Sequence, residues 1–250
     1  MSVAYSVIIP AFNEEELLAA SLDKLFIAMK SNALSGEIIV VDNNSCDRTS
    51  EIARNFGVTV VFEPLNQISR ARNAGAKVAK GKYLIFLDAD TIISPELLNT
   101  ALGLLGSGNY CGGGVLVEGD SPLPKPMQCV LDFWNWFSLR YGFAAGCFIY
   151  CLHDGFDAIV GFSERVYASE EIWFSIKLKY WGLQRGLKFK IISSPRVVTS
   201  MRKLEWYSPW QLFFRALLIL LFPPSLCFRA LCVLWYQRPD LNVRKDYIDR

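Results

Sequence analysis

Histidine is almost absent from this sequence, which holds only His153 in 250 residues. The seven cysteines are scattered, and none forms a Cys-x-x-Cys pair. A zinc site built from Cys and His therefore has too few neighbouring ligands. We expect the cysteines to be buried free thiols in a reducing compartment, and we assign His153 no function.

The sequence also lacks a large excess of either charge. It has 26 Lys and Arg and 24 Asp and Glu, which gives a net charge of +2. A chain with this balance is not a polycation, so we expect no nucleic-acid partner. The N-terminus has no basic segment before its apolar residues. We therefore expect no signal peptide and a cytoplasmic active domain.

An apolar run long enough to cross a membrane is also missing. The best candidate lies between Arg215 and Arg229 and has 13 uncharged residues. A spanning helix needs about 20 such residues. Pro223 and Pro224 interrupt this run, so we expect no single membrane-spanning helix.

The tail at residues 205–250 is nevertheless apolar and aromatic, and residues 201–250 hold eight Lys or Arg against four Asp or Glu. This composition is typical of segments that lie on a membrane surface. We expect two short interfacial helices, or a re-entrant hairpin, at the cytoplasmic face of a membrane. A tail packed on the domain is the alternative. Four aromatic residues would lie at headgroup level: Trp206, Trp210, Trp235 and Tyr236.

Residues 1–204 have the pattern of one α/β domain. Short apolar runs alternate with segments of helical periodicity, which predicts a mostly parallel, Rossmann-like sheet with helices on both faces. Asn13 is the expected cap of the first helix. Strands are expected at 6–9, 38–41, 58–62 and 83–87, and helices from 14, at 47–56, at 69–79 and from 95.

The second half of the domain is less regular. Three glycines lead into an expected strand at 115–117, and three prolines predict a loop at 122–126. An unusually aromatic stretch follows at 132–143. A helix is expected at 169–182 with its first residue as N-cap, and a strand at 187–193.

Polar side chains follow the expected strands at their carboxyl ends, where parallel sheets bind ligands. Asp42 ends the second strand, and Asp88 and Asp90 end the fourth. Residues i and i+2 of a strand point to the same side, so the latter two carboxylates meet, and the small Ala89 leaves room for a ligand. A shared Mg²⁺ or Mn²⁺ would relieve their repulsion. A pair of capping or loop acids is the alternative.

Four motifs follow one another along the first half of the chain: SVIIPAFNE at 6–14, IVVDNNSCDRT at 39–49, ARNAGAKVAKG at 71–81 and YLIFLDAD at 83–90. Together they resemble the family 2 glycosyltransferases, which have a GT-A fold, and the resemblance spans residues 5–200. Residues 161–182 resemble the segment that carries the catalytic carboxylate in that family, here with the pair Glu170 and Glu171.

The resemblance implies an inverting transfer of a sugar from a nucleotide-diphosphate donor to a hydroxyl or phosphate acceptor. A metal ion on Asp90, with help from Asp88, would neutralise the charge that grows on the leaving diphosphate. A general base must take the acceptor proton. Glu171 is the expected base and Glu170 the reserve. Without the resemblance, helix-start electrostatics would explain both acids.

The resemblance also implies a donor pocket. Asp42 is expected to read the base, Arg72 to lie near the nucleotide, and Arg202 to meet the diphosphate through its fork of donors. The alternatives are a solvated helix face for Arg72 and a membrane-surface arginine for Arg202. Further pocket residues follow from the motifs: Pro10, Ala11, Phe12, Glu14, Asp88 and Ala89.

Two residues depart from the family pattern, since Asn43 and Glu171 both stand where an aspartate is usual. A UDP-sugar is the favoured donor, with a GDP-sugar as the second candidate. The apolar tail favours a lipid or lipid-linked acceptor at the membrane surface. Two other functions stay open. One is a sugar-phosphate nucleotidyltransferase, against which the acidic, glycine-free residues 10–16 argue. The other is a catalytically silent, nucleotide-binding membrane scaffold.

Overall fold

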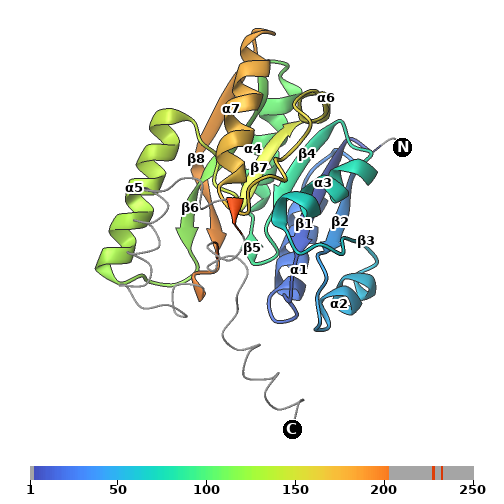
Figure 1. Cartoon of the computed structure of the whole chain (residues 1–250). Coiled ribbons are helices and arrows are strands. Elements are labelled where there is room, and N and C mark those ends of the chain that lie inside the picture. The colour runs from blue at the N-terminus through green and yellow to red at the C-terminus, as the bar shows by residue number, and fades with distance from the viewer. Residues whose placement is uncertain (1–2, 203–226, 229–231, 233–250) are drawn as a thin grey trace.

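The computed structural model describes residues 3–202, 227, 228 and 232, in which helices cover a curled central sheet (Figure 1). The strands are β1 (Tyr5–Ala11), β2 (Gly36–Asp42), β3 (Thr59–Phe62), β4 (Tyr83–Leu87), β5 (Thr91–Ile92), β6 (Tyr110–Gly119), β7 (Phe148–Leu152) and β8 (Lys188–Thr199). The helices are α1 (Leu18–Lys30), α2 (Thr49–Asn55), α3 (Ile68–Val78), α4 (Pro95–Gly106), α5 (Lys125–Tyr141), α6 (His153–Ala158) and α7 (Glu170–Leu183).

The described strands form one sheet in the order β3-β2-β1-β4-β7-β6-β8-β5. The first four pair in parallel, as the sequence predicts. β7 pairs antiparallel with β4 and with β6, and β6 runs parallel to β8. β7 therefore joins a parallel half to a half of mixed direction.

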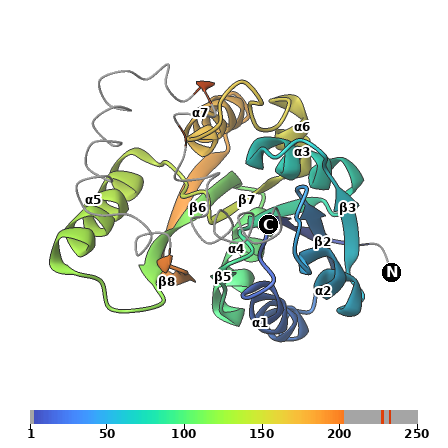
Figure 2. The same cartoon turned by 60° about the horizontal axis from the view of Figure 1, so that its bottom comes forward.

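Alternate side chains of the central strands pack on opposite faces of the sheet. Val7 and Ile9 of β1 belong to a core with Leu22 of α1 and Leu98 of α4. Ile8 belongs to a second core, which includes side chains of α3 and α7. Figure 2 shows α1 and α4 on one side of the sheet and α3 and α7 on the other. Because both faces are covered, these strands have continuous apolar sequences rather than alternating ones.

Two helix starts differ from the prediction. α1 begins at Leu18, and Asn13 has a left-handed backbone with φ of 55° instead of capping a helix. The Asn13 side chain accepts a hydrogen bond from the backbone N–H of Cys46 at 2.8 Å, so it joins the loops after β1 and β2. Ser169 before α7 has φ of 59° and makes no side-chain cap.

The second half has more regular structure than the sequence predicts. β6 begins five residues before the predicted strand, and β8 continues to Thr199. α5 begins at Lys125, inside the loop predicted at 122–126, and holds residues 132–141 of the aromatic stretch. β7 and α6 are not among the predicted elements. A side chain at Gly113 would collide with the Lys190 carbonyl, so glycine is needed where β6 lies against β8.

Within the described residues, no helix is both long and apolar enough to cross a membrane. The predicted interfacial tail lies outside these residues, apart from positions 227, 228 and 232. All seven cysteines are described and are free thiols, as expected. Cys46, Cys129 and Cys227 are exposed, so the prediction that all are buried is wrong.

Candidate active site

The carboxyl ends of β1 and β2 are level, since Ala11 pairs with Asp42, and Asp88 follows the end of β4. The backbone N–H of Ser45 donates to the Asp42 carboxylate at 2.9 Å, which fixes that side chain at the end of β2. The other predicted pocket residues lie on the same edge: Pro10 and Ala11 buried in β1, Phe12 half-buried, and Glu14, Ala89 and Asp90 buried.

A buried arginine, Arg72 of α3, lies at the centre of the site. Its guanidinium donates to Glu170 at 2.5 Å, to Asp88 at 3.1 Å and to the carbonyl of Gly146 at 2.8 Å. It also lies over the Phe162 ring, 5.1 Å from the ring centroid. Only 1% of the side chain is exposed, so the solvated helix face considered for Arg72 is wrong. A charge buried this deeply depends on its partner carboxylates.

The two adjacent acids at the start of α7 have different surroundings. Glu170 is 4% exposed and ion-paired with Arg72. Glu171 is half-buried and forms no ion pair with any described residue. Burial, followed by the charge of Glu170, raises the pKa of Glu171 to about 8. Glu170 therefore holds the arginine, whereas Glu171 exchanges its proton near neutral pH.

Arg202 links Asp90 to the loop after β1. Its guanidinium pairs with the Glu14 carboxylate, and the same nitrogen lies 4.0 Å from Oδ2 of Asp90. The Thr199 hydroxyl lies 3.5 Å from the other oxygen of Asp90. With 15% of its side chain exposed, Arg202 is at the sheet edge rather than on an open surface. A guanidinium in this position suits the phosphates of a nucleotide.

Asp88 and Asp90 act on a common buried group, the Cys147 thiol. Burial first, and then the charges of both aspartates, raise the pKa of that thiol. Among the described residues, no group of three or more His, Cys, Asp or Glu side chains is placed to hold a metal ion. A Mg²⁺ or Mn²⁺ ion shared with substrate phosphates needs only one or two protein carboxylates. These two aspartates fit such an ion.

Asn43, which replaces the usual aspartate, has a structural role. Its side-chain amide donates to the carbonyls of Glu63 at 3.1 Å and Leu65 at 2.7 Å. Its side-chain oxygen accepts from the backbone N–H of Gln67 at 2.9 Å. An aspartate at this position would have no N–H to donate to the carbonyls of Glu63 and Leu65. Asn43 therefore fixes the loop between β3 and α3.

Gly146 is a residue of the site that was not among the predicted ones. A Cβ at this position would lie 3.3 Å from Nη2 of Arg72 and 3.9 Å from the Glu171 carboxyl carbon. The available signal was the run of small residues at 144–146 before a short apolar segment. His153 lies apart from this cluster, with Nδ1 2.8 Å from the carbonyl oxygen of Gly81.

The model of glycosyl transferase family 2 matches residues 6–159, which is more than half of the chain. The chain belongs to this family.

Known proteins agree with this assignment. An uncharacterized glycosyltransferase of Rickettsia prowazekii is 25% identical over 232 residues, which cover 85% of this chain and 72% of that protein. Another from Haemophilus influenzae is 35% identical over 102 residues, or 40% of this chain. The chain spans only 34% of the Haemophilus protein's length.

Solved structures confirm the predicted GT-A fold. A mannosyltransferase from Pyrobaculum calidifontis, in complex with GDP-Man and Mn²⁺, has a TM-score of 0.62 at 19% identity, covering 86% of this chain and 60% of that one. Residues 1–349 of S. aureus TarS, in complex with UDP-GlcNAc, have a TM-score of 0.60 at 21% identity, covering 80% of this chain and 59% of that one.

Proposed function

We propose that this protein is an inverting glycosyltransferase that moves a sugar from a nucleotide-diphosphate donor to a hydroxyl or phosphate acceptor. One observation carries the proposal: Arg72 joins Asp88, at the donor edge of the sheet, to the acid pair of α7. Asp88 and Glu170 both bind this buried guanidinium, and Glu170 is the neighbour of Glu171, whose pKa is raised. This arrangement suits a single displacement between a bound donor and an acceptor.

Glu171 takes the proton of the acceptor. Its pKa of about 8 is close to the working pH of a general base. The charge of Asp88 is one cause of this raised pKa, so a cation held at Asp88 would lower it and favour the carboxylate form of Glu171. Glu170 acts through Arg72, which it holds in place.

Asp88 and Asp90 would hold the Mg²⁺ or Mn²⁺ ion, and Arg202 would exchange Glu14 for the donor diphosphate. When bound, the ion supplies positive charge against the leaving diphosphate. Asp42 and the residues that end β1 form the pocket of the base and ribose. Structural neighbours in complex with UDP-GlcNAc and with GDP-Man support a nucleotide-sugar donor, of which we favour a UDP-sugar.

We further propose a lipid or lipid-linked acceptor at the cytoplasmic face of a membrane. In α5, polar side chains are buried and large apolar side chains are exposed, and this arrangement supports the proposal. On its buried side, the Asn135 amide pairs with both the N–H and the carbonyl of Val117, at 2.9 and 2.8 Å. Its exposed side chains are largely apolar or aromatic, a composition typical of helices at a membrane interface. The large apolar and aromatic ones are Val130, Phe133, Trp136, Leu139 and Tyr141, and the exposed polar ones are Lys125, Gln128, Asp132 and Arg140.

The test is nucleotide release from UDP-sugars and GDP-sugars, with a polyprenyl phosphate as acceptor and with Mn²⁺, Mg²⁺ or EDTA. We expect release that needs metal, from one of the two donor classes. Asp90→Asn and Glu171→Gln should abolish it, whereas Asp23→Asn, an exposed change on α1, should not. A folded wild type that binds nucleotide and metal, but neither transfers nor hydrolyses the donor, would instead be the silent scaffold.

A further inference from the structure

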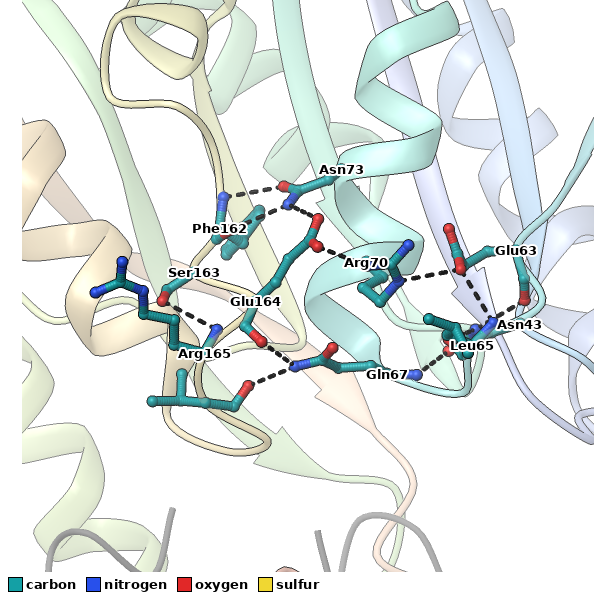
Figure 3. A network of polar contacts seen from close by, with 11 residues as sticks. Asn43, Glu63, Leu65, Gln67, Arg70, Asn73, Phe162, Ser163, Glu164 and Arg165 are labelled. Atoms are coloured by element: carbon teal, nitrogen blue, oxygen red, sulfur yellow. Dashed lines mark hydrogen bonds and ion pairs between the residues drawn. The ribbon is translucent and has the colours of Figure 1, made fainter. Parts of the chain in front are cut away.

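A chain of hydrogen bonds joins the end of β2 to the loop before α7 (Figure 3). It starts at Asn43, the neighbour of Asp42, whose side-chain oxygen accepts from the backbone N–H of Gln67. The Gln67 side-chain amide then donates to the carbonyl oxygens of Glu164 and Val166, both at 2.9 Å. The donor edge is thereby connected to the segment that leads into the acid pair.

Two further side chains of α3 hold the same loop (Figure 3). Arg70 is ion-paired with the Glu164 carboxylate at 2.7 Å. Asn73 exchanges two hydrogen bonds with the backbone of Phe162, each at 3.0 Å. α3 therefore clamps residues 162–166 from one side.

Gln67 is the buried anchor of this clamp. It is 5% exposed, whereas the Arg70 side chain is 32% exposed. Both amide hydrogens of Gln67 bind backbone carbonyls, so their loss would leave inner carbonyls without a donor. The loop also has left-handed backbone at Val160, Gly161 and Ser169. A loop of this kind keeps its conformation only where its surroundings hold it.

We propose that Gln67 is a positioning residue that sets Glu171 relative to the donor edge by joining Asn43 to residues 162–166. This inference rests on the proposed function, in which Glu171 is the base. A misplaced base slows the transfer step, because reacting groups must be aligned within a fraction of an ångström. Donor binding at Asp42, Asp88 and Asp90 depends much less on this loop.

Gln67→Met tests the proposal, because methionine has a similar length and no hydrogen-bond donor. We expect kcat to fall by about ten- to a hundredfold. The KM for the donor should stay within about twofold, since an effect on kcat alone reports a loss in the transition state. The matched control is Gln184→Met, at an exposed glutamine after α7, which should keep the wild-type kcat.

Hydrogen exchange provides a second measurement that needs no activity. In Gln67→Met, backbone amides of residues 163–171 should exchange faster, while those of β2 keep wild-type rates. Should this variant fail to fold, Arg70→Met removes the half-exposed contact to Glu164, together with the Arg70 ion pair to Glu63, and should give a smaller effect in the same direction.

Two results would overturn the positioning role. One is a folded Gln67→Met variant with unchanged kcat and unchanged exchange at 163–171. The other is a variant whose kcat and KM worsen together while exchange increases across the whole sheet, since that result indicates general destabilisation. A wild-type protein without donor turnover would refute the proposed function instead. The hydrogen-exchange experiment would then still test whether Gln67 holds residues 162–166 in place.

Discussion

The Arg72 guanidinium and the Glu170 carboxylate lie 2.5 Å apart in the interior, with 1% and 5% of their side chains exposed. Arg72 comes from α3 and Glu170 from α7, so the pair joins elements 98 residues apart in sequence. The charge of Glu170 is also a cause of the raised pKa of Glu171. One ion pair therefore links the assembly of the site to the pKa of Glu171, the proposed base.

Arg72→Met should destabilise the fold strongly. The change leaves the buried Glu170 and the half-buried Asp88 without their cation, and breaking a buried ion pair such as Arg72–Glu170 from one side costs about 3–5 kcal/mol. Urea denaturation measures the free energy of unfolding. The double variant Arg72→Met/Glu170→Gln should recover part of the loss. A single variant as stable as the wild type would contradict the role of the ion pair.

Glu171→Gln should abolish transfer and stabilise the fold at alkaline pH. The pKa of Glu171 is about 8 in the folded protein, against an ordinary value of 4.5. The unfolded chain therefore loses this proton first, and the wild type loses stability as the pH rises from 4.5 towards 8. Glutamine does not ionise and avoids that loss.

Melting temperatures measured across this pH range test the stability effect of Glu171→Gln. The variant should melt above the wild type near pH 8, by about 2–4 °C for each kcal/mol recovered, and equal it near pH 4. Glu51→Gln, an exposed change on α2, serves as control and should show no such trend. A constant difference at every pH would argue against a raised pKa.

The placement of polar side chains at the carboxyl edge of the sheet was predictable from the sequence because it follows from local rules. Parallel strands end at the same edge, so Asp42, Asp88 and Asp90 had to lie there. Contacts between distant segments were not predictable. The burial of Arg72 depends on α7, whose acids lie far along the chain. The place of Gly146 depends on β7, a short strand whose position is set by antiparallel pairing with β4 and β6, far from it in sequence.

Asn43→Asp should destabilise the protein although it restores the usual family residue. The carboxylate keeps the bond from Gln67 but would lie against the carbonyls of Glu63 and Leu65, which now accept from the amide. Leaving buried groups without partners costs about 1–3 kcal/mol. Asn44→Asp, the same change at the exposed neighbouring residue, is the control in urea denaturation. Equal stability of the two variants would contradict this account.

Asp90→Asn should remove the metal-dependent stabilisation by nucleotide. A ligand at a hundred times its Kd stabilises the folded state by about 2.7 kcal/mol, so the wild type should melt higher with UDP or GDP and Mn²⁺ than with EDTA. The variant should show no difference between Mn²⁺ and EDTA. Asp23→Asn, exposed on α1, should respond as the wild type does. A full response in Asp90→Asn would place the ion elsewhere.

Replacing two exposed aromatic residues of α5 should weaken binding to membranes. Phe133 and Trp136 are 63% and 55% exposed, and their rings lie 5.8 Å apart. Inserting such a pair into the interface buries apolar surface, so Phe133→Ser/Trp136→Ser should lower the affinity for anionic vesicles by about tenfold or more. Phe62→Ser, at an equally exposed phenylalanine of β3, is the matched control in vesicle sedimentation. If the double variant and the control sediment alike, α5 is not the membrane-binding surface, and any binding that remains must come from other parts of the chain.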